Sequence, residues 1–299
     1  MVSQVAVVYN PKKISLEKLT SLFPESKPVI AKDVRKGLVE LGDFSRLVVA
    51  GGDGTLRIVV QYLMENHLKT PIGIIPVGTG NILARNLGIS LDMDQAAKTA
   101  IDGNLKQIDI GKAKVRSRSP IFFTGIAGLG LDAKIMEKTD NRLKKRIGWV
   151  AYIEGGIRAL PARFQKFNIT VDNQQPRRVK VLTLMIANTG TLPGRVELIP
   201  DAEVDDGNLD VAVIGPRWIW NWIDVLGRIT WQNRFVRPLV LGRKLMDATA
   251  DLKSLEYLRG RKIKVESESE STLQIDGDPI GPVKEVSFEV IPKALVVSC

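Results

Sequence analysis

Short apolar runs alternate with amphipathic stretches over the first third of the chain. The apolar runs predict buried strands at Gln4–Tyr9, Arg46–Ala50 and Ile72–Pro76. Glycine-rich turns follow the second and third of these runs. Helical stretches come next, at Thr55–Leu63 and near Ile82–Leu87, where apolar residues recur every three or four positions. Strand, glycine turn and helix in this repeated order predict an α/β domain with a parallel sheet.

Beyond about residue 112 the pattern changes to short apolar segments separated by Pro, Gly, Asn or Asp. This change predicts a mostly antiparallel second domain. Its expected strands are Lys112–Val115, Ile121–Thr124, Phe167–Val171, Lys180–Ala187, Leu209–Ile214, Arg261–Glu266, Thr272–Ile275 and Val286–Ile291. Helical insertions are expected near Arg142–Leu160 and Trp218–Leu258. Gly125–Gly130 is interpreted as a tight packing turn, and Ser267–Ser271 as a solvated turn.

Composition agrees with a two-domain globular chain. The 299 residues are about twice the ~150 of a typical domain, with 44% hydrophobic and 25% charged residues. The longest run without a charge, Thr70–Ala84, is too short for the ~20 apolar residues of a membrane span. The first residues have neither a basic region nor the cleavage pattern of a signal peptide. We therefore expect a cytoplasmic protein that could also bind to the surface of a membrane. A single cysteine, Cys299, and a single histidine, His67, argue against disulfides, multi-cysteine zinc sites and histidine-based triads.

The net charge of +10 favours an anionic partner such as a nucleotide, a nucleic acid or a membrane surface. A basic surface without any particular partner is an equally good interpretation of the charge alone. No basic stripe is interleaved with aromatic residues, so a nucleic-acid partner is not expected. A Walker motif is absent, and so is a dinucleotide-binding glycine pattern that opens a helix after a strand.

The sharpest chemical signal is the turn Gly51–Thr55, with the sequence GGDGT. Its glycines allow close approach of a ligand to the backbone, and the helix that follows presents N–H groups that favour phosphate. Asp53 would serve a Mg²⁺ ion or a water bound to it. The alternative is a tight turn in which Asp53 caps the helix. A second glycine turn, Gly78–Asn81, follows the next strand and would approach the same ligand.

Further motifs accompany these turns along essentially the whole chain. They are VVYNP at Val7–Pro11, PVGTGNILARNLGI at Pro76–Ile89, GLGLDA at Gly128–Ala133, IPDAEVDDGNLDV at Ile199–Val211 and QIDGDP at Gln274–Pro279. With them the chain resembles the diacylglycerol kinase catalytic family, specifically its bacterial soluble branch, which is related to sphingosine and long-chain-base kinases. GGDGT alone also occurs in NAD kinases, and the C-terminal motifs favour the lipid kinases.

The resemblance implies an α/β nucleotide-binding domain and a β-sandwich lipid-substrate domain, with the active site between them. The first would comprise residues 1–112 together with the returning residues 292–299, and the second residues 113–291. The implied activity is ATP-dependent transfer of the γ-phosphate to the hydroxyl of diacylglycerol or a related lipid alcohol. Two alternatives stay open: a catalytically weak lipid- or nucleotide-binding protein of the same fold, and a NAD kinase.

The resemblance also assigns roles to residues. The implied ATP contacts are Asn10, Lys12, Gly51, Gly52, Asp53, Gly54, Thr55, Thr79, Gly80 and Asn81. The implied general base is Asp278, with Asp276 beside it and Asp53 completing the catalytic set. A structural Mg²⁺ would be held by the Asp206 side chain and the backbone carbonyls of Glu203 and Asn208. An Asp-Gly turn without metal is the alternative for this loop.

Two departures from the family pattern bear on activity. Asp278 stands where the family has glutamate, which retracts the carboxylate by one methylene. The loop Asn10–Ile14 lacks the serine and glycine that usually wrap phosphate, and Lys12 or Lys13 would supply charge instead.

A tryptophan-rich segment offers a way to reach a lipid. Trp218, Trp220 and Trp222 lie close together, on a stretch with one apolar face and an opposite face that carries arginines. Such a helix could lie in a membrane interface, or it could pack on the protein core. Family members are often dimers, and the sequence leaves the oligomeric state open.

Overall fold

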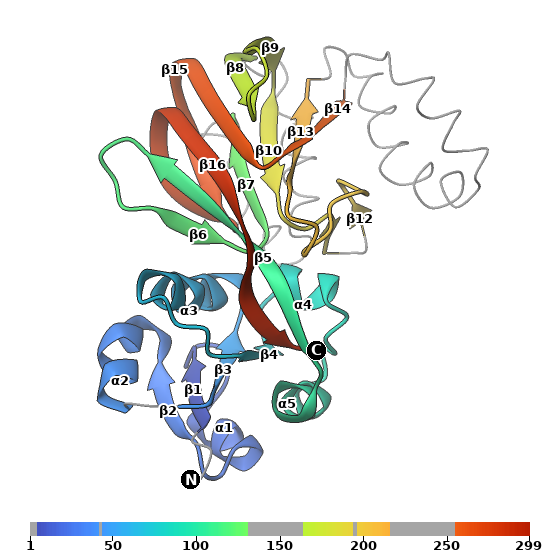
Figure 1. Ribbon diagram of the computed structural model, residues 1–299. Helices are drawn as coiled ribbons and strands as arrows, with labels where there is room; N and C mark the ends of the chain where they lie inside the picture. The colour runs from blue at the N-terminus through green and yellow to red at the C-terminus, as the bar shows by residue number, and fades with distance from the viewer. Residues whose placement is uncertain (1–4, 42–43, 131–163, 194–195, 216–254) are drawn as a thin grey trace, which may run out of the picture.

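The computed structural model describes residues 5–41, 44–130, 164–193, 196–215 and 255–299 (Figure 1). Its N-terminal half contains a parallel sheet in the order β4-β3-β1-β2. The strands are β1 (Val5–Tyr9), β2 (Lys27–Ile30), β3 (Arg46–Gly51) and β4 (Ile72–Pro76). The helices are α1 (Leu16–Leu22), α2 (Val34–Leu41), α3 (Asp53–Glu65), α4 (Ile82–Asn86) and α5 (Met93–Asp102), with a 3₁₀ turn at Ala31–Asp33. The predicted α/β class is therefore confirmed.

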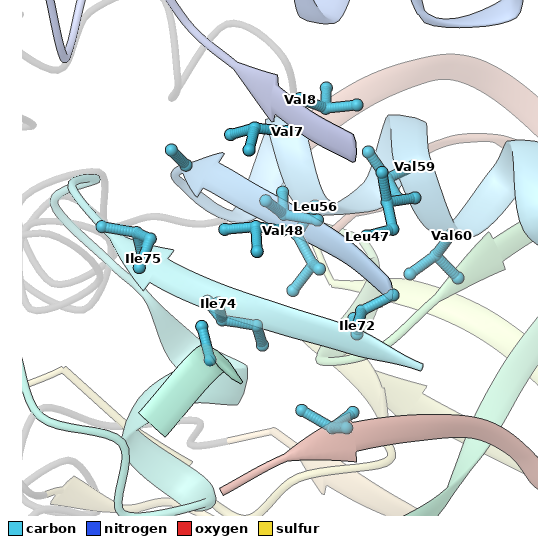
Figure 2. Packing of buried hydrophobic residues seen from close by; sticks show 14 of the residues in the cluster. Val7, Val8, Leu47, Val48, Leu56, Val59, Val60, Ile72, Ile74 and Ile75 are labelled. Atoms are coloured by element: carbon cyan, nitrogen blue, oxygen red, sulfur yellow. The ribbon is translucent and has the colours of Figure 1, made fainter. Parts of the chain in front are cut away.

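The core of this half forms where α3 packs on the parallel strands (Figure 2). The strands are buried on both faces, which explains their continuous apolar sequences. The helix contributes Leu56, Val59 and Val60, which recur at helical spacing and are all buried. Each such side chain stabilises the fold by ~1.5–3 kcal/mol through burial.

The C-terminal half is a set of antiparallel strands in the order β14-β13-β10-β7-β15-β16, with β5 and β6 beyond β16 and β8 and β9 beside β15. The strands are β5 (Leu105–Val115), β6 (Ile121–Phe123), β7 (Ile126–Leu129), β8 (Gln165–Val171), β9 (Arg177–Val181), β10 (Thr183–Ala187), β13 (Leu209–Ile214), β14 (Leu255–Gly260), β15 (Lys262–Ile275) and β16 (Asp278–Ser298). A small separate pair consists of β11 (Thr191–Leu192) and β12 (Val196–Glu197). Phe123 and Phe288 meet edge to face in the core, with ring centroids 6.2 Å apart.

Two long strands, β5 and β16, run from one half into the other (Figure 1). They pair antiparallel from Val115 opposite Val286 to Leu105 opposite Ser298, with one irregularity. Near its end β16 also pairs with β4 in parallel. Arg46 donates hydrogen bonds to the Ala100 carbonyl at 2.8 Å and to Ser298 Oγ at 2.6 Å. The last residues of the chain are thus part of the N-terminal sheet.

Several expectations for the antiparallel half are wrong in detail. Ser267–Ser271 is not a turn but lies within β15, where the register shifts relative to β16. Gly125–Gly130 contains strand β7 rather than a turn. Lys180–Ala187 is divided into β9 and β10 at Leu182, whose N–H is bonded to the Ile214 carbonyl. The expected helix Trp218–Leu258 is replaced by strand β14 from Leu255 onward.

The rest of that insertion and the insertion Arg142–Leu160 lie outside the described residues. Among the helices that the structure describes, none is long and apolar enough to cross a membrane.

Candidate active site

The two glycine turns lie in direct backbone contact. The Val77 N–H donates to the Gly51 carbonyl at 3.1 Å. A Cβ atom on Gly78 would lie 2.5 Å from the Gly52 Cα, so neither turn has room for a side chain at this contact. The glycines therefore allow the ends of β3 and β4 to form one continuous rim.

Asp53 joins the two turns through its carboxylate. It accepts hydrogen bonds from the N–H groups of Asn81 at 2.8 Å and Ile82 at 2.6 Å. Asp53 therefore binds the start of α4, whereas α3, its own helix, has Gly52 at its N-cap and no side-chain cap. Burial raises the pKa of Asp53, and the bonds from Ile82 and Asn81 act in the opposite direction.

The other expected nucleotide contacts lie along the same edge of the sheet. Asn10 follows β1, and its N–H donates to the Ala50 carbonyl at 3.0 Å. Its Oδ1 accepts the Lys12 N–H at 3.0 Å. Asn81 folds into its own turn, where its Oδ1 accepts the Gly78 N–H at 2.9 Å. Lys12 and Thr79 are exposed and can turn toward a ligand.

The hairpin between β15 and β16 carries the two other predicted catalytic aspartates. Ile275 pairs with Asp278, so Asp276 and Gly277 form a two-residue turn. Both have positive φ, 48° and 84°, as a type I′ turn requires, and Asp-Gly is a preferred sequence for it. The turn points Asp276 and Asp278 into different surroundings.

Asp276 is buried against the backbone of the segment before β7. Its carboxylate accepts N–H groups from Thr124 at 3.1 Å, Gly125 at 2.9 Å and Ile126 at 3.0 Å. Burial raises the pKa of Asp276 to about 7; the Thr124 bond opposes the rise, and the nearby charge of Asp53 adds to it. The aspartate therefore fixes the hairpin to the segment beneath it.

Asp278 is half-exposed and faces the N-terminal half. Its Oδ2 lies 2.7 Å from Arg57 Nη2, and 3.5 Å from where a Cβ on Gly54 would be. The expected base thus lies directly beside the GGDGT turn. The structure brings Asp53, Asp276 and Asp278 together from segments far apart in the sequence.

Amide side chains fix the two halves against each other on both sides of this site. Gln61 of α3 donates to the Pro120 carbonyl at 2.9 Å and accepts the Phe122 N–H at 3.0 Å. Asn86 of α4 donates to the Thr191 carbonyl at 2.7 Å and accepts the Thr191 N–H at 3.1 Å. Neither amide was expected from the sequence, and Arg57 was not expected either. Arg57 and Gln61 have one sequence signal, polar residues at intervals of four along α3, and Asn86 has none.

The acidic loop before β13 is held by a buried aspartate, Asp109, which was also missed. Asp109 accepts the N–H groups of Gly207 at 2.6 Å and Lys293 at 2.7 Å. Its own N–H donates to the Val204 carbonyl at 2.7 Å. Asp109 therefore fixes this loop to the point where β16 enters the N-terminal half.

The charges of this loop fit a bound cation. Asp206 Oδ1 accepts the Asn208 N–H at 2.9 Å, while its Oδ2 is buried without a hydrogen bond and 3.3 Å from Arg259 Nη2. Arg259 also binds Asp210 at 2.8 Å. Burial raises the pKa of Asp210, Arg259 opposes the rise, and the charges of Asp206 and Glu203 add to it. Arg259 thus pairs with two carboxylates and feels the charge of a third, Glu203, so negative charge exceeds positive charge in this group.

Carboxylate side chains alone would not make a metal site. In the described part of the chain, no three acidic, histidine or cysteine side chains are placed to share an ion. A cation would therefore also need backbone carbonyl oxygens, as the sequence analysis expected for Glu203 and Asn208.

Comparison with known proteins identifies the family. Residues 4–113 match the diacylglycerol kinase catalytic domain, and residues 125–299 match the YegS C-terminal NAD kinase beta sandwich-like domain. The chain belongs to the family that combines these two domains, as the sequence motifs predicted.

Individual relatives agree with this assignment. The chain is 33% identical to a diacylglycerol kinase of Staphylococcus carnosus (strain TM300) over 58% of its own length, which spans 55% of that relative. It is 28% identical to a diacylglycerol kinase of Bacillus subtilis (strain 168) over 80% of its length and 72% of the relative. A solved diacylglycerol kinase structure from Bacillus anthracis str. Sterne has a TM-score of 0.75 at 21% identity, covering 99% of this chain and 96% of that one. The last comparison confirms the two-domain fold.

Proposed function

We propose that this protein is an ATP-dependent lipid kinase that transfers the γ-phosphate to the hydroxyl of diacylglycerol or a related lipid alcohol. The observation that carries the proposal is the position of Asp278. Its carboxylate, which comes from the β-rich half, lies beside Gly54 of the glycine turn in the α/β half. A base next to a phosphate-binding turn is the minimum arrangement for transfer to an alcohol.

The nucleotide would bind along the rim formed by the two glycine turns. Backbone N–H groups at the start of α3 favour phosphate, and the contact between Gly52 and Gly78 makes the rim continuous. We assign the ATP contacts to Asn10, to Lys12, to the turn residues 51–55 and to residues 79–81. The corresponding domains would be residues 1–112 with 292–299, and residues 113–291.

The transfer step follows from this arrangement. Asp278 accepts the hydroxyl proton while the hydroxyl oxygen forms a bond to the γ-phosphorus. The bond between that phosphorus and the bridging oxygen of ADP breaks, and ADP leaves. Backbone N–H groups and basic side chains would stabilise charge on the three equatorial oxygens, which is the main demand of phosphoryl transfer.

Two places have chemistry that suits Mg²⁺. At the reaction site, Asp276 is buried and Asp53 is partly buried, and the charge of Asp53 acts on Asp276, so a cation would offset their repulsion. Mg²⁺ bound there with ATP would neutralise phosphate oxygens. In the acidic loop, the buried Asp206 Oδ2 would be the side-chain ligand, joined by the carbonyl oxygens of Glu203 and Asn208.

The acceptor lipid lies in a membrane, so the proposal includes contact with a bilayer surface. Trp218, Trp220 and Trp222, which could make that contact, lie outside the described residues. A homodimer stays an expectation from the family resemblance.

Two other functions remain for the test to exclude. A NAD kinase is disfavoured because residues 4–113 match the diacylglycerol kinase catalytic domain. A catalytically weak binding protein is favoured only by the shortened base and the altered Asn10–Ile14 loop.

The test is transfer of labelled γ-phosphate from Mg·ATP to a panel of lipids in mixed micelles. The panel would contain diacylglycerol, monoacylglycerol, ceramide, a sphingoid base and a polyprenol, with NAD in a separate reaction. A labelled lipid that Asp53→Ala does not produce supports the kinase and names its substrate. No labelled lipid, with ATP still bound, would favour the binding protein instead.

A further inference from the structure

Arg57 lies between the two halves of the molecule at the reaction site. It belongs to α3, one helical turn after Asp53, and reaches across to Asp278 at the start of β16. The Nη2–Oδ2 distance of 2.7 Å is that of a charge-assisted hydrogen bond. Only 20% of the arginine side chain is exposed, against 46% of the aspartate. The arginine is therefore the more buried partner of the pair.

The helix that carries Arg57 is anchored on both sides of this residue. Asp53, at the start of the same helix, is bound to Asn81 and Ile82 by short hydrogen bonds. Gln61, four residues after Arg57, binds the backbone of Pro120 and Phe122 in the other half. Residues four apart lie on the same face of a helix, so Arg57 and Gln61 form one contact surface toward the β-rich half.

The pair uses only one oxygen of the aspartate. Within the described residues Asp278 Oδ1 has no hydrogen-bond partner, while Oδ2 is bound to Arg57. An aspartate has two side-chain torsions, so a bond at one oxygen fixes where the other oxygen points. The free oxygen is then available to a hydroxyl.

We propose that Arg57 is a positioning residue for the transfer step: it binds Asp278 Oδ2 and thereby directs Oδ1 toward the acceptor hydroxyl. This inference rests on the proposed kinase function and adds to it a residue outside the glycine turns and the hairpin. It also explains how a carboxylate one methylene shorter than glutamate keeps a defined position beside Gly54. A displacement of about 1 Å in a reacting group can lower a rate ~10²-fold.

The test compares kcat and KM in the lipid assay for Arg57→Met and Arg57→Lys. We expect Arg57→Met to lower kcat ~10²-fold with KM for ATP changed less than ~3-fold, and Arg57→Lys to recover about tenfold of that loss. Arg35→Met is the matched control. Arg35 lies on α2 and pairs with Glu65, the last residue of α3, away from the reaction site. It should leave kcat unchanged.

A double-mutant cycle separates positioning from a purely structural role. If Arg57 acts through Asp278, Arg57→Met should cause no further loss of kcat in an Asp278→Asn background. An equal loss in both backgrounds would overturn the proposal, and so would an unchanged kcat or an increase in KM for ATP alone. If Arg57→Met strongly lowers the melting temperature, the kcat of Arg57→Lys and the double-mutant cycle still distinguish positioning of Asp278 from a purely structural role. A wild-type protein that labels no lipid would instead refute the kinase function, and the role of Arg57 with it.

Discussion

Asp276 and Asp278 lie two residues apart on one hairpin, yet their surroundings have little in common. Asp276 is buried and accepts three backbone N–H groups, and its pKa is raised to about 7. Asp278 is half-exposed and binds one guanidinium through Oδ2, and within the described residues its Oδ1 has no hydrogen-bond partner. The difference follows from the turn, since the left-handed conformations of Asp276 and Gly277 direct the two side chains apart. Under the proposed function, Asp276 would hold the hairpin in place and Asp278 would be the reacting group.

The largest expected effect comes from Asp53, whose charge reaches Asp276. Asp53→Ala removes the acceptor for the Asn81 and Ile82 N–H groups and a carboxylate suited to Mg²⁺. We expect phosphate transfer to fall about 10³-fold. The measurement is labelled lipid formed per minute at saturating ATP, with circular dichroism as the control for folding. Transfer within threefold of wild type would show that Asp53 is not needed for the reaction.

The next effect is on stability and separates the two hairpin aspartates. Asp276→Ala leaves three N–H groups without their acceptor, which should lower the free energy of unfolding by roughly 3 kcal/mol. Asp278→Ala, the matched control, should lower it by less than ~1 kcal/mol because its ion pair is partly exposed. Urea unfolding at constant pH measures both. Equal losses would contradict the division of roles.

A smaller effect is the pH dependence that Asp276 gives to the fold. Its pKa is raised from 3.8 to about 7, so between these values the folded chain holds a proton that the unfolded chain has lost. The resulting stability is complete below about pH 4 and is lost as the pH rises through 7. From pH 5 to pH 7 the decline should be roughly 2 kcal/mol.

Urea unfolding in EDTA over this range measures the decline, since it removes any effect of a bound cation. Asp276→Asn should flatten it and Asp278→Asn should not. An unchanged slope in Asp276→Asn would assign the proton to another group, such as Asp53, whose pKa is also raised.

The sequence predicts the elements best where apolar runs end in turn residues. The expected strands Ile72–Pro76 and Leu209–Ile214 have the same bounds in the structure. The sequence does not predict the full length of β15, because the alternating Ser and Glu of Ser267–Ser271 are typical of a loop when the partner strands are unknown. It also underestimates β16, which continues through Pro292 into the first half. The bounds of these two strands depend on pairing with segments that are distant in the sequence, and the local pattern of apolar and polar residues does not show that pairing.

The residues of the candidate site also differ in how well the sequence predicts them. Asp276 and Asp278 could be chosen because they lie in a short motif of the family, although their partners come from distant segments. Arg57 and Gln61 could not, because their partners depend on how the two halves pack together. Asp53 was also chosen from a short motif, GGDGT, but its hydrogen bonds to the start of α4 were not foreseen.

The most direct test of the account separates phosphate transfer from ATP binding in Asp278→Asn, with Asp278→Glu beside it. If Asp278 is the base, the asparagine variant should lose about 10³-fold in transfer and bind a non-hydrolysable ATP analogue within ~3-fold of wild type. The glutamate variant, which retains a carboxylate, should keep transfer within about tenfold. Loss of ATP affinity in Asp278→Asn, or transfer close to that of wild type, would contradict the assignment of Asp278 as the reacting group.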